Sequence, residues 1–342
     1  MISKASTLFM GAMLLEAGLL LSPAAFGHHS SAMYDDHRTV TIKGTVTKFE
    51  WSNPHVYVYL EQTVGNDKVL WEVECNPPSI LKRVGWNQDT VHLGDTLEIT
   101  GSPHRDPSKK SLLPEKIRLG SVDLFDRKRE LGRLAKVDET SAATHGHNLD
   151  GVWVTVLSIK AEELLESSKL PLTPKGKQAA HDFDEKKMHP GAQCVPYPPP
   201  IFMITPDMKR ITTVGHTLVI DGEFDNAQRT VRMDQASHEG ASSSVQGDSI
   251  GHWEGDTLVV DTTLFSDHAM GISYGVPSSA GKHLVEHMTL DADGKKLSYH
   301  VELTDPEYLA KPVSADVQWV FRPDLHYAAL KCDPENAARY RR

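Results

Sequence analysis

Regular alternation of apolar and polar residues is the feature of this sequence that most constrains its fold. The segments RTVTIKGTVTKFEW (38–51) and HVYVYLEQTV (55–64) alternate with a period of two, which is typical of half-buried strands. The same period returns near residue 216 and continues to DVQWVFRPD (316–324). Strands of this kind must cover one apolar face, so we predict a mainly β protein.

An OB-like domain is predicted for residues 28–127. A third strand pattern, KVLWEVEC (68–75), is followed by NPPSILKRVGW (76–86), in which prolines precede apolar residues at helical spacing. Two more strand patterns lie at 94–106 and 115–125. Three strands, a helix and two strands are the order of a five-stranded Greek-key barrel, whose exposed face and loops bind many ligands.

The remainder of the chain is predicted to hold a linker and a second β domain. Residues 128–147 lack an apolar period and are assigned to the linker, and the second domain is assigned to residues 148–342. Within it, Thr173 is expected to cap a helix from Pro174 to about Lys187.

Turn-linked strand patterns dominate the rest of this second domain. Their connecting turns include Glu-Gly-Asp (254–256) and Asp-Ala-Asp-Gly (291–294), and the second of these ends in a strong hairpin signal. Such pairs predict a lipocalin-like antiparallel barrel or sandwich with an interior cavity.

Residues 1–27 have the layout of a secretory signal peptide. An apolar stretch covers 7–21, and Ala25 and Gly27 are the small residues expected before a cut at His28. No later segment is apolar enough to span a bilayer, so we expect a periplasmic or secreted bacterial protein; an uncleaved anchor is the alternative. The net charge of −10 argues against a nucleic-acid partner.

The chain has three cysteines, Cys75, Cys194 and Cys332. In an oxidising compartment, three thiols allow one disulfide and leave one thiol over. We predict the pair Cys194–Cys332 because both residues lie in the second half of the chain.

Distinctive motifs in each half resemble families without an assigned reaction. The first half contains the motifs HHSSAMYDD (28–36), GTVTKFEWSNPHVYVYL (44–60), LKRVGW (81–86) and GDTLEITGSPHRD (94–106). With these motifs it resembles an uncharacterised family of exported bacterial proteins. The second half contains the motifs LTPKGKQAA (172–180), GDSIGHWEGDTLVVDTTLF (247–265) and LTDPEYLAKP (303–312). With these motifs it resembles an uncharacterised domain of environmental bacteria. The first family has Gly near position 75, which fits Cys75 as the unpaired thiol.

The two histidines at the predicted mature N-terminus suggest a copper site. Cleavage before His28 would give one residue a free α-amine and an imidazole, and His29 adds a second ring. Nitrogen ligands of this kind suit copper, and the arrangement resembles the histidine brace of copper monooxygenases and copper carriers. His55 is a further candidate ligand. The alternative is a frayed terminus whose histidines are solvated.

A carboxylate is predicted inside the second barrel. In HLVEHMTL (283–290), Leu284, Glu286 and Met288 share one face, and Tyr299 lies on the apolar face of the partner strand. A carboxylate in such an interior must be paired or have a raised pKa, which would suit acid–base catalysis by Glu286 with Tyr299. The alternative is a structural ion pair with an arginine such as Arg232 or Arg322.

Strand alternation places further candidates near the same interior. His252 and Trp253 alternate in direction, so one of them points inward, and His252 is a third candidate acid–base group. Trp253 and Trp319 join Leu284 and Met288 as candidate ligand contacts. Glu254 and Asp256 are interpreted as turn residues.

Three functions are compatible with these features. The first is an exported protein that binds a small, largely apolar molecule in the barrel cavity. The second is an enzyme acting on such a molecule there, and the third is a copper-binding protein. Phosphate-loop, serine-hydrolase and zinc-protease motifs do not occur in the sequence.

Overall fold

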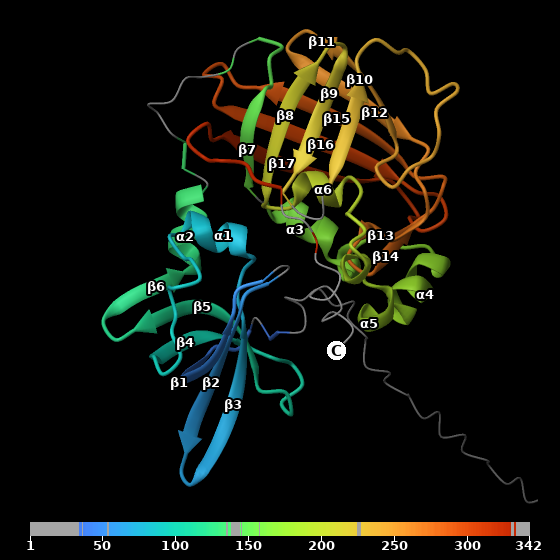
Figure 1. Ribbon diagram of the computed structural model, residues 1–342. Coiled ribbons are helices and arrows are strands. Elements are labelled where there is room, and N and C mark those ends of the chain that lie inside the picture. The colour runs from blue at the N-terminus through green and yellow to red at the C-terminus, as the bar shows by residue number, and fades with distance from the viewer. Residues whose placement is uncertain are drawn as a thin grey trace, which may run out of the picture.

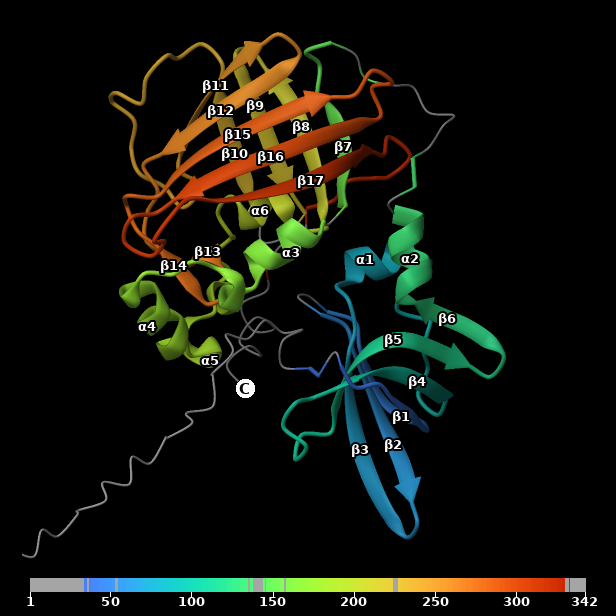
Figure 2. The same cartoon turned by 180° about the vertical axis from the view of Figure 1, so that it is seen from behind.

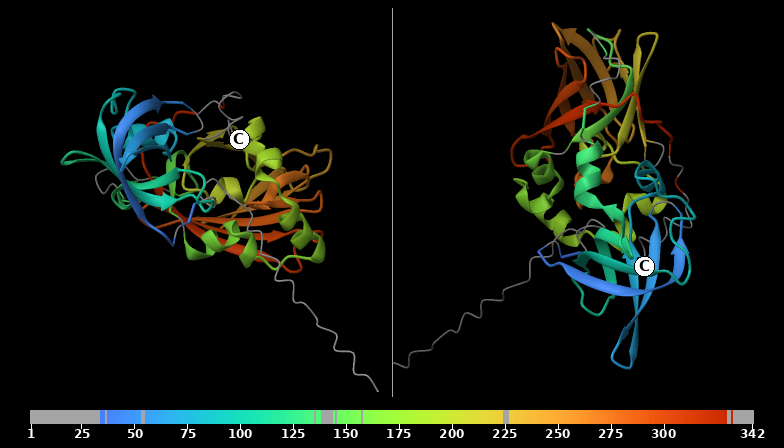
Figure 3. Two further views of the ribbon diagram at one scale, coloured as in Figure 1. Left: turned by 90° about the horizontal axis from the view of Figure 1, so that it is seen from below. Right: turned by 90° about the vertical axis from the view of Figure 1, so that its left-hand side faces the viewer.

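Two β-barrels, one from each half of the chain, form the molecule (Figure 1). The computed structural model describes residues 34–35, 37–52, 55–134, 136–137, 144, 146–156, 158–223, 227–329 and 332. Each barrel contains its own hydrophobic core, and views from other directions show the same separation (Figures 2 and 3).

The N-terminal barrel has the predicted OB-like topology. Its strands follow the order β3-β2-β1-β4-β5-β6, and a parallel contact between β3 and β5 closes the first five. The structure adds β6 to the predicted three strands, helix and two strands. The elements are β1 (Val40–Glu50), β2 (Tyr57–Val64), β3 (Asp67–Glu74), α1 (Pro78–Arg83), β4 (Thr96–Pro103), β5 (Ser111–Leu119) and β6 (Val122–Asp126).

Side-chain alternation explains why these segments form a barrel. In β1, Ile42 and Val46 are buried while the residues between and beside them are mostly exposed. Gly101 allows β4 to bend closely against β5, because a Cβ atom there would lie 2.1 Å from the carbonyl oxygen of Leu113. The apolar faces then meet in one core.

The C-terminal barrel is a closed meander of nine strands, lipocalin-like as predicted. Neighbours are antiparallel except for β10 and β11, which run parallel. Directions cannot alternate all the way round a closed ring with an odd number of strands, so one parallel pair is required. The strands are β7 (Gly151–Val156), β8 (Met208–Val214), β9 (Thr217–Gly222), β10 (Gln228–Arg232), β11 (Asp248–Glu254), β12 (Thr257–Thr263), β15 (His283–Leu290), β16 (Lys296–Thr304) and β17 (Val313–Phe321).

Most predicted strand pairs of this barrel are present. The pairs β11–β12 and β15–β16, whose turns the sequence predicted, are antiparallel, and so is the pair β9–β10. A separate two-stranded sheet of β13 (His268–Ser273) and β14 (Val276–Ser278), which the sequence did not predict, lies between β12 and β15 in the chain.

Short helices lie beside the barrels, and the predicted extent of one of them needs correction. The predicted linker is helical at its start, where α2 (Arg127–Leu134) forms; Glu130 is buried there and contacts Arg129 and Arg133. The predicted helix from Pro174 ends earlier, at Asp182. Its N-cap Thr173 accepts a hydrogen bond from the Gly176 amide, as expected. The remaining helices are α3 (Ile159–Leu165), α4 (Pro174–Asp182), α5 (Glu185–Met188) and α6 (Ile201–Ile204).

A disulfide joins Cys194 to Cys332, as predicted, with 5.6 Å between the two Cα atoms. Cys75 is free and buried in the core of the N-terminal barrel. Among the described residues, no helix is both long and apolar enough to cross a membrane.

Candidate functional site

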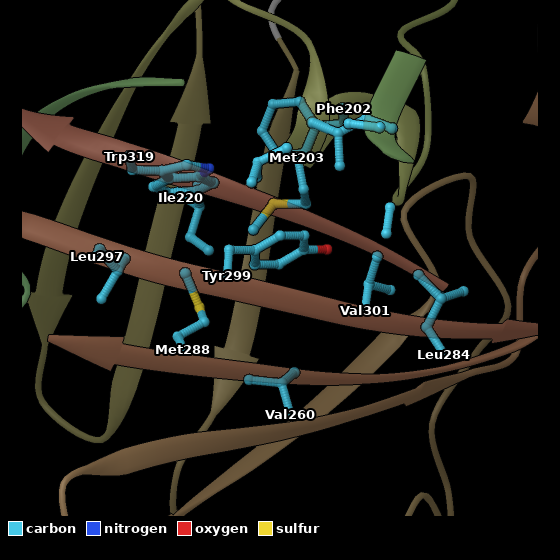
Figure 4. Close-up of a cluster of buried hydrophobic side chains, with 14 of the residues drawn as sticks. Phe202, Met203, Ile220, Val260, Leu284, Met288, Leu297, Tyr299, Val301 and Trp319 are labelled. Carbon is cyan, nitrogen blue, oxygen red and sulfur yellow. The ribbon is translucent and has the colours of Figure 1, made fainter. Parts of the chain in front are cut away.

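Large side chains occupy the interior of the C-terminal barrel, where the sequence predicted a cavity. Figure 4 shows Tyr299 beside Trp319 and Met203, with Met288 and Leu284 on the neighbouring strand. The rings of Tyr299 and Trp319 stack with 5.9 Å between their centroids. Three of the predicted ligand contacts (Leu284, Met288 and Trp319) therefore belong to the packed core.

Glu286 lies inside this core and is paired with Arg229. Arg229 donates through Nη1 to Oε1 of Glu286 at 2.7 Å and through Nη2 to Oε2. The hydroxyl of Tyr299 donates to Oε1 at 2.7 Å. Arg229 also donates to the hydroxyls of Ser249 and Thr262, so the guanidinium is bonded on every side.

This network holds the side chains of Glu286 and Tyr299 in a buried, hydrogen-bonded arrangement. Burial raises the pKa of Tyr299 well above its usual value, and the neighbouring Glu286 carboxylate raises it further. The carboxylate is fully buried and ion-paired, as in the structural alternative. The partner is Arg229, however, because Arg232 pairs with Asp248 and Arg322 with Asp324. Arg232 follows Val231, whose side chain is buried, so alternation turns Arg232 away from the interior.

His252 lies apart from this network. Its side chain is on the outer face of β11, is 64% exposed and contacts Glu254 at 2.9 Å. Trp253 is the inward member of the pair; it packs against the core and stacks on His147 with 4.0 Å between ring centroids. The structure thus brings together Glu286 and Tyr299 but not His252.

The copper prediction falls mostly outside the described residues, which do not include His28 and His29. His55 lies two residues before the start of β2, and its Nδ1 is 2.5 Å from Oε1 of Glu74. Burial opposes ionisation of Glu74, but His55 and the Tyr34 hydroxyl outweigh it and lower the pKa. Within the described part of the chain, no three histidine, cysteine or acidic side chains are placed to hold a metal ion.

A chain of charged groups lies on the outer face of the C-terminal barrel. His238 contacts Asp248 through Nδ1 at 2.6 Å and Asp261 through Nε2 at 2.8 Å. His283 contacts the second oxygen of Asp261. Burial lowers the pKa of His238, but the hydrogen bonds that its ring donates to the carboxylates of Asp248 and Asp261 outweigh this effect, so the pKa is raised. Both ring nitrogens can donate only in the imidazolium form.

A cavity of about 630 Å³ lies between the two barrels. Figures 1 and 2 show α1 on the side of the N-terminal barrel that faces the lower ends of β8 and β9. Most of the wall is apolar surface, contributed by both barrels. The lining residues are Trp51, Ser52, Pro78, Lys82, Arg83, Met208, Glu223, Leu325, His326 and Ala328.

An ion pair between the barrels forms part of the wall of this cleft. Arg83, at the end of α1, contacts Oε2 of Glu223 through Nη2. The side chain of Arg83 is 7% exposed and that of Glu223 is 1% exposed. Arg83 also accepts a hydrogen bond at its carbonyl from Arg133 of α2, so two helices hold this position.

Two other cavities are less suitable as ligand sites. One, of about 440 Å³, is a groove on the outer face of β15, β16 and β17 beside His287 and His300. The other, of about 130 Å³, lies in the N-terminal barrel beside His55 and Cys75 and has room for only a few small atoms. The cleft is the one of the three that joins apolar walls from both barrels to a buried ion pair.

Sequence reasoning missed Arg229 as well as Arg83 and Glu223. Alternation in QRTVR (228–232) places Arg229 on the same face as Val231, so this inward arginine was detectable. The pairing of Arg83 with Glu223 joins residues of different barrels, and no local pattern carries that information.

Comparison with known proteins supports the predicted resemblance of the first half to an uncharacterised family. Residues 18–113 match a family of unknown function (DUF6152). No curated protein is similar enough to count as a match. The resemblance of the second half to an uncharacterised domain stays a prediction.

Three solved structures illustrate distant similarity, and each covers only part of this chain. Mitochondrial single-stranded DNA-binding protein Rim1 of S. cerevisiae has 13% identity and a TM-score of 0.20, over 24% of this chain and 93% of its own. The S. pombe Stn1-Ten1 complex has 15% identity and a TM-score of 0.20, over 28% of this chain and 64% of its own. C. elegans lipid binding protein 8 has 11% identity and a TM-score of 0.25, over 50% of this chain and 94% of its own. Likeness at this level says nothing of what this chain binds.

Proposed function

We propose that this chain is an exported protein that binds a small, largely apolar molecule in the cleft between its two barrels. The observation that carries the proposal is the cleft itself. Its volume of about 630 Å³ lies within the range of pockets for small organic ligands. Its walls combine apolar side chains with a few polar groups, which is the usual composition of such pockets.

The packed C-terminal barrel supports this location over a site inside the barrel. Trp153 and Trp319 are fully buried within it, and the Arg229–Glu286 pair crosses its interior. Entry of a guest would require displacing bonded charges as well as packed rings. The cleft needs no such rearrangement, because its space is already present.

Export is part of the proposal. The layout of residues 1–27 supports it, and so does the disulfide between Cys194 and Cys332, since such bonds persist in oxidising compartments. The periplasm of a bacterium or the extracellular medium would meet this condition.

Native mass spectrometry of the full chain, expressed with its own N-terminal segment and purified from the periplasm, tests the proposal. We expect a non-covalently bound organic molecule that is released by collisional activation. The variant Ala328→Trp, which adds bulk to the cleft wall, should reduce its occupancy, whereas Ala329→Trp at the exposed neighbouring position should not. Retention of the same ligand by the Ala328→Trp variant would place the site elsewhere.

A further inference from the structure

We infer that the ligand of the cleft carries a carboxylate, which Arg83 binds; this inference rests on the proposed function. Arg83 uses Nη2 for its contact with Glu223. Its Nε and Nη1 are buried and have no hydrogen-bond partner among the described residues. Two nitrogens of one guanidinium therefore remain without a partner on a residue that lines the cleft.

Leaving such donors unbonded is costly. Burying a polar group without a hydrogen-bond partner destabilises a protein, and burying a charged group without one destabilises it more. A guanidinium presents its N–H groups in a fixed planar fork, and carboxylate oxygens match that spacing better than a single hydroxyl does. The unfilled donors of Arg83 thus select the head group of the ligand.

The charges around the cleft also favour an anion. Lys82 and Arg83 both line it and carry positive charge, whereas Glu223 is the one acidic residue among the described residues of the lining. Part of the Glu223 charge is already offset by Arg83, and its Oε2 also accepts from the Met208 amide at 3.3 Å. The opposing feature is Oε1 of Glu223, which is buried without a hydrogen-bond partner in the described structure and would repel an anion placed directly against it.

The remaining walls define the body of the ligand. Trp51 and Pro78 come from the N-terminal barrel, and Met208 and Leu325 come from the C-terminal barrel. These side chains offer apolar contact and no charge. A carboxylate attached to a hydrocarbon chain or ring, an amphiphilic monocarboxylate, therefore fits both parts of the cleft.

Calorimetric titration of the full-length mature protein with octanoate and with octan-1-ol at pH 7 tests this inference. The two probes share their hydrocarbon chain and differ in charge. We expect octanoate to bind at least about tenfold more tightly than octan-1-ol, which corresponds to about 1.4 kcal/mol. Arg83→Gln should abolish the difference, and Lys43→Gln, which changes an exposed β1 lysine outside the cleft, should preserve it.

The Arg83→Gln variant leaves Glu223 without its cation and could lose the native fold. The double variant Arg83→Gln/Glu223→Gln removes both charges and keeps two amides across the same contact, so it should fold and lose the preference for octanoate. Equal binding of both probes, or preference for the alcohol, overturns the carboxylate inference while the proposed function stands. If neither probe binds and no ligand accompanies the purified protein, both fail.

Discussion

Replacement of Glu286 by glutamine should strongly destabilise the C-terminal barrel. The substitution removes one charge and keeps the size of the side chain. Glu286 is 0% exposed and Arg229 is 2% exposed, so the remaining guanidinium has no access to solvent. Tyr299 also loses its carboxylate acceptor.

The expected loss follows from this burial. Removing one partner of a buried ion pair costs about 3–5 kcal/mol, because the other charge is left uncompensated. A typical domain has an unfolding free energy of about 5–15 kcal/mol, so the loss is a large share of the total. Glu254→Gln on β11 provides a matched control; its side chain is 65% exposed, and a change within about 0.5 kcal/mol is expected.

Urea denaturation followed by circular dichroism measures these values. The double variant Glu286→Leu/Arg229→Met should cost less than the sum of the two single changes, since it leaves no unpaired charge in the core. Strict additivity, or a loss below about 1 kcal/mol for Glu286→Gln, would refute the ion pair as a structural element. Glu286 would then again be a candidate for catalysis.

Replacing Cys194 and Cys332 together by alanine should lower the unfolding free energy by about 4–5 kcal/mol, because the bond joins residues 138 positions apart; a loss below about 1 kcal/mol in urea would contradict this. Burial lowers the pKa values of His189 and His268 to about 4, so the unfolded state binds more protons between pH 6.5 and about 4. Stability should therefore fall as the pH falls through that window, and thermal melts of His189→Gln/His268→Gln should show a smaller fall. His238 has a raised pKa in the folded protein. Its contribution to the unfolding free energy is therefore complete at pH values below its usual pKa of 6.5, and it is lost as the pH rises through the raised pKa. An NMR titration that finds the His238 pKa at or below 6.5 would disprove this.

Local alternation was sufficient to predict most of the strands. The burial pattern of β16, in which Leu297, Tyr299, Val301 and Leu303 are buried, follows from the period of two alone. The small sheet of β13 and β14 was missed because β14 has only three residues and cannot show a period. The helical start of the predicted linker was missed because most residues of α2 are charged.

The partner of Glu286 depended on long-range order. The sequence showed a carboxylate on an apolar strand face, and physical chemistry then required a cation nearby. Arg229 lies 57 residues earlier and reaches Glu286 only because β10, β11, β12 and β15 follow one another around the barrel. The predicted disulfide was easier to find, since three cysteines leave few pairings.

The cleft could not be predicted from local patterns. Its lining comes from residues that follow β1, from α1, from β8, from Glu223 after β9 and from the segment after β17, and these meet only when the two barrels are in place. The LKRVGW motif contains Lys82 and Arg83, but nothing in that motif distinguishes a buried arginine from an exposed one.

The position of the buried ion pair is explained by the closure of the C-terminal barrel. The parallel contact of β10 with β11 has only two residue pairs, Val231 with Ser249 and Arg232 with Ile250, whereas β15 and β16 share eight. Backbone hydrogen bonds are therefore sparse where the odd number of strands forces a parallel pair.

Side chains cross this weak contact. Arg229 reaches from β10 to Ser249 on β11 on the inner side, and Arg232 reaches Asp248 on the outer side at 2.6 Å. Glu286 neutralises the inner arginine from β15, and His238 reinforces Asp248 from the loop that joins the two strands. Burying a guanidinium is unfavourable in an apolar core, but here it supplies hydrogen bonds that the short strand pair lacks. The charges inside the barrel thus follow from the topology of its closure, which supports our proposal that ligand binding occurs in the cleft.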